Sequence, residues 1–300
     1  MKKIAGYNFL TFFSPLDLVT VFYALLSGFY MCFSTASFTL LVPHFVTRAL
    51  ILILIVCLSG LAHKFQTNKL VLFLRNLYPL LFLGFFYTET SCLKNIIFSE
   101  NLDLYFFNAE QSLWNCQPSI EFSRVMGQGW FNELMNLCYF SYYLLISVVC
   151  IVLYLKKQSL SQKSIFVVIL SFYLYYIIFA ILPVVGPQYY LTNLPDTTPP
   201  YFFGKLMHHI IVNLEQPTGA FPSSHVGIAI IIAYVAYKHL KKIFFIILPF
   251  VVGICFATVY VKAHYVIDVI AGLISAPLFI ILSEKIYNKF LSCNSKKMAN

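Results

Sequence analysis

The sequence predicts an all-α integral membrane protein with about eight transmembrane helices. Of its 300 residues, 60% are hydrophobic and only 10% are charged, and the mean hydropathy is +0.81. A chain this apolar is typical of multi-span membrane proteins and not of soluble domains. Segments long and apolar enough to cross a bilayer recur at residues 14–33, 45–62, 70–88, 134–155, 164–183, 221–238, 243–261 and 264–283.

The charged residues between these spans are unevenly distributed. Most lysines lie at the two ends of the chain and in every second loop between successive spans, and these positions are all on one side of the membrane. Most acids lie in the other loops, on the opposite side. The positive-inside rule makes the lysine side cytoplasmic, so both termini are expected there. Cationic loops beside anionic lipid headgroups also explain the net charge of +9, and we expect membrane lipids rather than nucleic acid as partners.

The chain divides into three parts along its length. Residues 1–69 contain N-terminal transmembrane helices whose residues suit packing alone. Residues 70–284 form the main transmembrane bundle, which includes an outer loop at 89–133, and residues 285–300 form a basic cytoplasmic tail. The loop mixes acids with large aromatic residues, which favours an interfacial helix that serves as a lid or substrate entrance. Its carboxylates are alternatively ordinary solvated charges.

Eight cysteines in a chain of this size do not form a disulfide framework. Most of them lie in or beside spans, where cysteine serves as a small apolar packing residue. Cys92 and Cys116 share the outer loop, so a disulfide between them is one possibility in an oxidising compartment and two free thiols are the other.

The first candidate site is the Pro-Ser-Ser-His sequence at Pro222–His225, where the sixth span starts on the outer face. A helix start presents free N–H groups and the positive end of the helix dipole, and both favour a bound phosphate. Ser223 and Ser224 add hydroxyl groups, and His225 adds a group that exchanges protons near neutral pH.

The second candidate site is His264 with Asp268. On a helix this spacing puts both side chains on one face, one turn apart. The carboxylate can then orient the imidazole by accepting a hydrogen bond from one ring nitrogen, which leaves the other nitrogen as a nucleophile or base. Because the chain crosses the membrane twice after His225, His264 returns to the same face. These residues together suggest covalent phosphoryl chemistry.

The two motifs resemble those of the type 2 phosphatidic acid phosphatase superfamily, over about residues 164–283, and the resemblance implies that the C-terminal six spans form the catalytic helical bundle of that superfamily. The Pro-Ser-Ser-His sequence is similar to its second motif, and His264-x-x-x-Asp268 is similar to the end of its third motif. The surrounding sequence looks closest to the branch of inositol phosphorylceramide synthases. The resemblance implies that His264 attacks phosphorus, Asp268 orients it, and His225 protonates the leaving oxygen. Ser223, Ser224 and Lys262 would hold the phosphate oxygens.

Several basic positions of the superfamily are replaced in this chain. Its first motif is absent, and a Ser-Arg pair is replaced by Ala257 and Thr258. The related branch has Gly-Pro-Arg where this chain has Gln188 as the third residue. The lost bidentate clamp leaves three residues as candidate substitutes, namely Lys205, Arg124 and His209.

The resemblance implies a metal-independent lipid phosphatase that hydrolyses a phosphate monoester or diphosphate through a phosphohistidine, without a cofactor. His208 and His209 are adjacent and lack the spacing of metal ligands on a helix face. Two alternatives stay open: a phospho-headgroup transferase, and a non-catalytic lipid-binding or transport protein. The expected location is a bacterial inner membrane, with the site facing the periplasm and both termini in the cytoplasm.

Overall fold

The computed structural model describes residues 12–191 and 201–298, with the side chains of 214 and 293–298 excepted. Within these ranges the chain forms helices and no strand. The helices are α2 (Pro15–Met31), α3 (Phe38–Lys64), α4 (Lys69–Leu93), α5 (Asp103–Trp114), α6 (Pro118–Val125), α7 (Gly129–Lys156), α8 (Gln158–Ile181), α9 (Pro187–Tyr190), α10 (Phe202–Leu214), α11 (Ser224–His239), α12 (Lys241–Tyr260) and α13 (Val266–Met298).

The predicted all-α membrane architecture is confirmed. Six of the described helices are long and apolar enough to cross a membrane: α3, α4, α7, α8, α12 and residues 266–292 of α13. Helices α2 and α11 occupy the other two expected positions with 17 and 16 residues, somewhat short of the roughly 20 that a bilayer requires.

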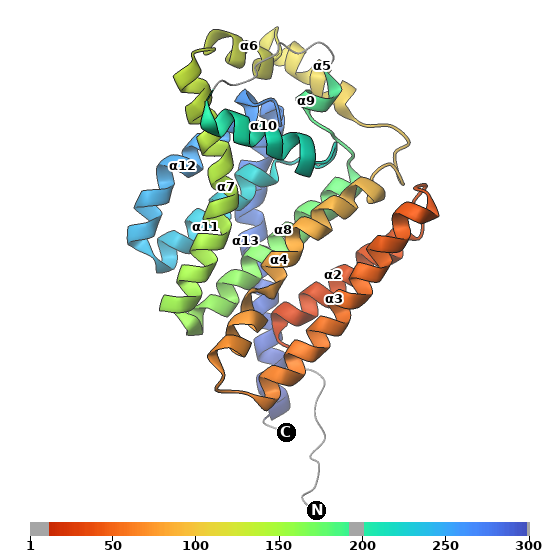
Figure 1. The fold of residues 1–300 in the computed structure, drawn as a ribbon, viewed down its shortest axis with the longest axis vertical. Helices are drawn as coiled ribbons and strands as arrows, with labels where there is room; N and C mark the ends of the chain where they lie inside the picture. Colours follow the sequence, from red (N-terminus) through yellow and green to blue (C-terminus); the bar gives the residue numbers. More distant parts are fainter. Residues whose placement is uncertain (1–11, 192–200, 299–300) are drawn as a thin grey trace, which may run out of the picture.

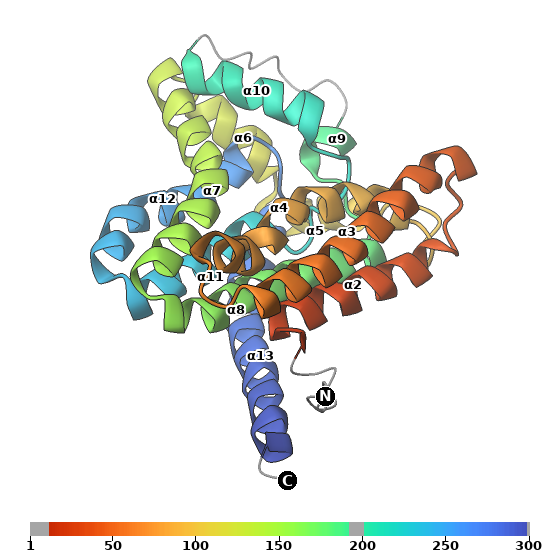
Figure 2. The ribbon, with the colours of Figure 1, turned by 60° about the horizontal axis from the view of Figure 1, so that its bottom comes forward.

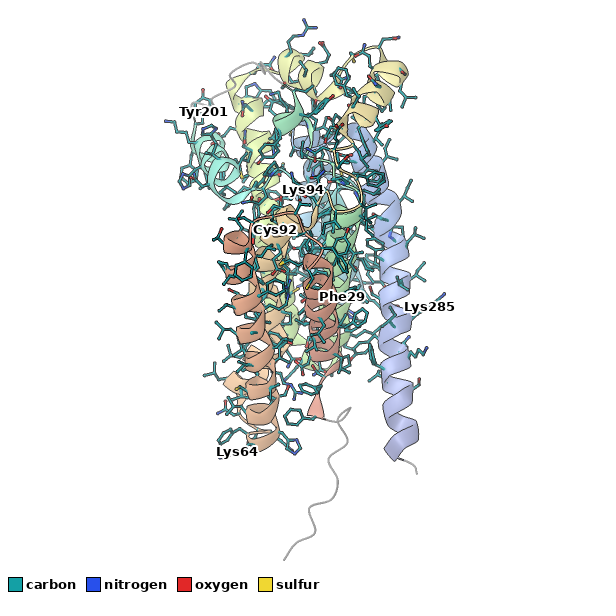
Figure 3. All side chains as sticks on the ribbon, turned by 90° about the vertical axis from the view of Figure 1, so that its right-hand side faces the viewer. Phe29, Lys64, Cys92, Lys94, Tyr201 and Lys285 are labelled. Atoms are coloured by element: carbon teal, nitrogen blue, oxygen red, sulfur yellow. The ribbon has the colours of Figure 1, made fainter. Side chains whose placement is uncertain are left out.

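The short helices gather at one end of the bundle. Figure 1 shows α5, α6, α9 and α10 at this end, and the start of α2 and the end of α13 at the opposite end. Lys94 and Tyr201 lie toward the short-helix end in Figure 3, whereas Lys64 lies at the other. Helix α13 continues beyond the bundle (Figure 2), so the described residues of the expected tail, 285–298, extend this helix.

Helix α8 is the centre of the bundle. Its most apolar stretch is 78% buried, the highest value among the six long helices, and it contacts α2, α4, α7, α11 and α13. Its sequence explains this position, because apolar residues surround the helix from Ile165 onward and leave no polar face there for a lipid headgroup or water.

Three acids from residues 89–133 have structural contacts, so they are not ordinary solvated charges. Asp103 accepts hydrogen bonds from the backbone at the start of α9. Glu110 accepts them from the first residues of α13, and Glu133 from those of α10. A carboxylate at a helix start satisfies free N–H groups and complements the helix dipole. These acids therefore fix the helices that surround the candidate site.

The N-terminal helices contain a buried ion pair that the sequence analysis did not anticipate. Arg48 Nη2 in α3 lies 2.6 Å from Glu89 Oε2 in α4, and both side chains are buried. The pair joins α3 to α4, and Nδ1 of His44 in α3 lies 3.6 Å from the other oxygen of the same carboxylate. Cys92 and Cys116 are free thiols in this structure, which is one of the two possibilities that the sequence left open.

Candidate functional site

The candidate site lies where three segments far apart in the sequence meet below the short helices. These are α9 with the turn before it, the segment that leads into α11, and the loop between α12 and α13 with the first turn of α13. Backbone hydrogen bonds of 2.8–3.0 Å join them: Ala220 N to Val184 O, Gln188 N to Lys262 O, and Ser223 N to Asp268 O. The two histidine motifs are thus attached to one backbone framework.

The structure brings His225 and His264 into direct contact. The Nδ1 atom of His225 lies 3.2 Å from Nε2 of His264, and the His264 side chain is almost fully buried. On its other side, His264 Nδ1 lies 2.7 Å from the carbonyl oxygen of Ala220. A carbonyl only accepts hydrogen bonds, so Nδ1 of His264 must donate. In the neutral ring, Nε2 then carries the lone pair, which faces Nδ1 of His225.

Asp268 is beside His264 but is not its nearest acceptor. Its Oδ2 atom lies 3.5 Å from His264 Nδ1, which is longer than the 2.7 Å to the Ala220 carbonyl. The same carboxylate oxygen accepts a 2.8 Å hydrogen bond from Tyr265 N, which holds the first turn of α13. Ala220 therefore shares the orienting position that the sequence analysis gave to Asp268 alone.

Burial sets the protonation of His264, which lies in the loop between α12 and α13. Loss of solvent contact lowers its pKa from 6.5 to about 4, while the Ala220 hydrogen bond and the charge of Glu215 act in the opposite direction. The imidazole is consequently neutral at pH 7. A neutral ring with a free Nε2 lone pair has the form that a nucleophile requires.

The other candidate residues have different environments. Ser223 is buried and caps α11, its hydroxyl accepting from Val226 N at 3.4 Å. Ser224 lies beside His225 in the wall of a cavity. Lys262 has φ +66° in the loop between α12 and α13, so it lies beyond the regular helix. Burial lowers the pKa of Lys262, and its side chain lines neither of the two cavities at the histidines.

Two cavities flank His225. The larger, of about 230 Å³, runs between α4, α7 and α8 and is mainly apolar. The smaller, of about 20 Å³, is enclosed by both histidines and the segment before α11. A volume of this size holds about one water molecule. The site therefore joins an apolar groove of lipid-tail character to a small polar chamber at the imidazoles.

Glu215 lines both cavities, and the sequence analysis missed its role because its contacts come from distant helices. Its Oε1 atom accepts hydrogen bonds from Tyr139 at 2.9 Å and Tyr143 at 3.0 Å. Its Oε2 atom lies 3.3 Å from Nε2 of Gln188. Gln188 occupies the position where the related branch has arginine. A neutral amide therefore faces this carboxylate where a guanidinium was expected.

The proposed basic substitutes do not reach the cavities. Lys205 and His209 are exposed on α10, and Arg124 pairs with Glu121 on α6. No lysine or arginine lines either cavity among the described residues. Within the same residues, no group of three or more His, Cys, Asp or Glu side chains is placed to hold a metal ion.

Comparison with known proteins gives one match. A sequence model of the PAP2 superfamily, the type 2 phosphatidic acid phosphatases, matches residues 106–282. This range extends from α5 into α13 and includes both histidine motifs. No curated protein and no solved structure matches the chain.

Proposed function

Because the chain belongs to the PAP2 superfamily, we propose that it is a membrane lipid phosphatase that works through a phosphohistidine on His264. The superfamily supports a phosphatase or phosphotransferase activity in general. The observation that carries the proposal is the His225–His264 contact: a neutral, backbone-oriented imidazole lies beside a second imidazole. His225 borders the larger cavity, which suits a lipid, and both histidines border the small chamber beside it.

The proposed reaction has two steps. Nε2 of neutral His264 attacks phosphorus, the bond from phosphorus to the leaving lipid oxygen breaks, and protonated His225 donates a proton to that oxygen and becomes neutral. Water then attacks the phosphohistidine and gives a proton to His225, and phosphate leaves, which restores neutral His264 and protonated His225. In-line transfer needs the nucleophile and the acid on opposite sides of phosphorus. The two rings must therefore separate when substrate enters.

The remaining residues have supporting roles in this proposal. Asp268 and the Ala220 carbonyl stabilise the positive charge that develops on His264. Ser224 and the free N–H groups at the start of α11 hold the equatorial oxygens. Ser223 caps that helix, and Lys262 would contribute only if its side chain turned toward the chamber. No cofactor is required for either step.

A phospho-headgroup transferase is the second candidate, in the manner that the resemblance to inositol phosphorylceramide synthases implies. It is favoured by the groove of about 230 Å³ that reaches His225, because an acceptor lipid can approach there instead of water. A non-catalytic lipid-binding or transport protein is the third candidate. It is favoured by the absence of lysine and arginine from the described cavity walls.

One assay separates these candidates. Purified protein in detergent is given phosphatidic acid, phosphatidylglycerol phosphate, and polyprenyl and sphingoid phosphates, with His264→Ala as the matched variant. We expect inorganic phosphate from the wild type alone. If phosphate is not released but the headgroup is transferred once a lipid alcohol is added, the protein is a transferase. If neither phosphate release nor transfer is detected, the binding protein is favoured.

We further propose that the site faces the periplasm of a bacterial inner membrane. The lysine distribution supports this orientation, and α9 and α10 beside the site lie at the end opposite the start of α2 and the end of α13 (Figure 1). The test fuses a reporter protein to the chain after residue 298. A reporter that works only in the cytoplasm should be active there, and one that works only in the periplasm should be inactive. A periplasmic C-terminal reporter would reverse the orientation.

A further inference from the structure

Resting on this proposed function, we infer that Glu215 and the surrounding tyrosines form a binding site for the ammonium group of an amine-bearing phospholipid headgroup. The inference rests on the His264 chemistry that the phosphatase and transferase candidates share. The preferred substrate would then be a zwitterionic phosphodiester, which favours the phospho-headgroup chemistry of the second candidate over release of inorganic phosphate from a monoester. The inference starts from the charge of the cavity walls, which does not match a phosphate alone.

A phosphate beside His264 would have an unusual electrostatic environment. The described walls of both cavities contain one carboxylate, Glu215, and no lysine or arginine. The positions of the missing basic residues hold Ala257, Thr258 and Gln188. A monoester dianion would meet the Glu215 charge with no lysine or arginine to compensate it, and one protonated His225 cannot balance both, which is unfavourable at short range in a poorly hydrated site. A ligand with its own positive charge removes this conflict.

Glu215 is held in place by neutral donors. The hydroxyl groups of Tyr139 and Tyr143 and the amide of Gln188 supply three hydrogen bonds. An ionised carboxylate has about four acceptor positions, so one is left for a ligand. None of the three donors neutralises the charge. The carboxylate is thus fixed in position while its negative charge stays available to a cation.

Aromatic rings surround the same part of the larger cavity. Tyr87, Tyr142, Tyr143 and Tyr176 line it together with Phe172 and Glu215. Tyr142 also packs against His225, with 4.3 Å between ring centroids. Ring faces attract ammonium groups, and several rings with a carboxylate are a recurrent arrangement for choline-like and alkylammonium ligands. His225 on this wall places the amine site next to the phosphoryl chemistry.

The reaction then has a defined outcome for phosphatidylethanolamine. The His264–phosphorus bond forms as the bond to the diacylglycerol oxygen breaks, and His225 supplies the proton to that oxygen. The phosphoethanolamine group stays on His264 with its ammonium at Glu215. Attack by water releases phosphoethanolamine, and attack by a lipid alcohol transfers it.

The test compares two lipids that differ only in the amine. Phosphatidylethanolamine and phosphatidylethanol have the same diacylglycerol and the same phosphodiester charge, and the second lacks the ammonium. Diacylglycerol release is measured in detergent micelles for wild type, Glu215→Gln and Glu215→Asp. The matched control is Glu121→Gln, which removes an exposed carboxylate on α6 that lines neither cavity.

We expect the wild type and Glu121→Gln to prefer phosphatidylethanolamine by about tenfold or more in kcat/KM, a difference in proportion to an ion pair with aromatic contacts. Glu215→Gln should reduce this ratio to about one, and Glu215→Asp should retain part of it. A folding defect would lower the activity on both lipids equally and would leave the ratio unchanged. Equal use of the two lipids by the wild type, or an unchanged ratio in Glu215→Gln, would overturn the inference while leaving the phosphatase or transferase proposal intact.

Binding is measured separately so that the two proposals fail separately. The catalytically disabled His264→Ala variant is heated in micelles that contain either lipid, with and without Glu215→Gln. The amine site is supported if phosphatidylethanolamine raises the Tm of His264→Ala more than phosphatidylethanol does and if Glu215→Gln removes this difference. This result does not require the wild type to turn over either lipid. Equal stabilisation, or none from either lipid, overturns it.

Discussion

The Nδ1 atom of His225 lies 3.2 Å from the Nε2 atom of His264, although the two residues are 39 positions apart in the sequence. The contact is short enough for a hydrogen bond. Because His264 Nδ1 donates to the Ala220 carbonyl, Nε2 accepts and Nδ1 of His225 donates. The two imidazoles therefore have different roles in the resting protein, and their roles can be separated by experiment.

We predict that the two histidines respond differently to the leaving group. A lipid alkoxide needs a proton to depart, whereas an aryl oxide departs without one, and a general acid typically contributes roughly 10²- to 10⁴-fold. His225→Ala should therefore lose about that factor on a lipid phosphate and much less on an aryl phosphate. His264→Ala should lose both activities. Exposed His209→Ala is the control, and equal losses from His225→Ala on both substrates would contradict its assignment as the acid.

We predict that the nucleophile stays active in mildly acidic solution. Protonation of His264 removes the Nε2 lone pair, and burial lowers the pKa of this group to about 4, so inactivation should begin only as the pH falls toward that value. The measurement is the single-turnover rate on an aryl phosphodiester, whose own charge is constant, in the His225→Ala background. An acid limb with its midpoint near 6.5 would disprove the prediction.

We predict that Glu110 makes stability depend on pH. Burial raises the pKa of Glu110 from 4.5 to about 7, so between these values the folded chain retains a proton that the unfolded chain releases. Stability from this group is greatest below about pH 4.5 and declines as the pH rises to about 7. Glu110→Gln keeps an acceptor for the start of α13 and should flatten this dependence. Tm in detergent at pH 5 and pH 7.5 provides the measurement, with Glu121→Gln as the control; an unchanged slope would contradict the prediction.

We predict that Gly272→Ala damages both stability and activity. A Cβ atom at Gly272 would lie 2.6 Å from the backbone oxygen of Ser223, so α13 must move away from the start of α11. This shift would move His225 relative to His264. Gly60→Ala on α3 is the matched control, because its Cβ would meet only Phe12, at 3.9 Å. We expect a lower Tm and a lower kcat for Gly272→Ala alone. Equal behaviour of the two variants would show that the helix contact yields without cost.

The membrane architecture could be predicted because it depends mainly on composition. Lipid contact requires long apolar segments whatever their partners, so helices occur at all the expected span positions. The alternation of spans also predicted that His225 and His264 would share a face, and helical periodicity predicted that Asp268 would lie beside His264. The structure agrees with these spatial relationships; the catalytic roles are still proposals.

Only the tertiary structure decided which groups complete the site. The carbonyl of Ala220 orients His264, but a backbone acceptor has no side-chain signature in the sequence. Glu215 enters the cavity because α7 brings Tyr139 and Tyr143 to it and α9 brings Gln188. Glu110 reaches the start of α13 from α5. Hydropathy determines which segments enter the membrane, whereas these contacts depend on how the helices pack, which local sequence does not specify.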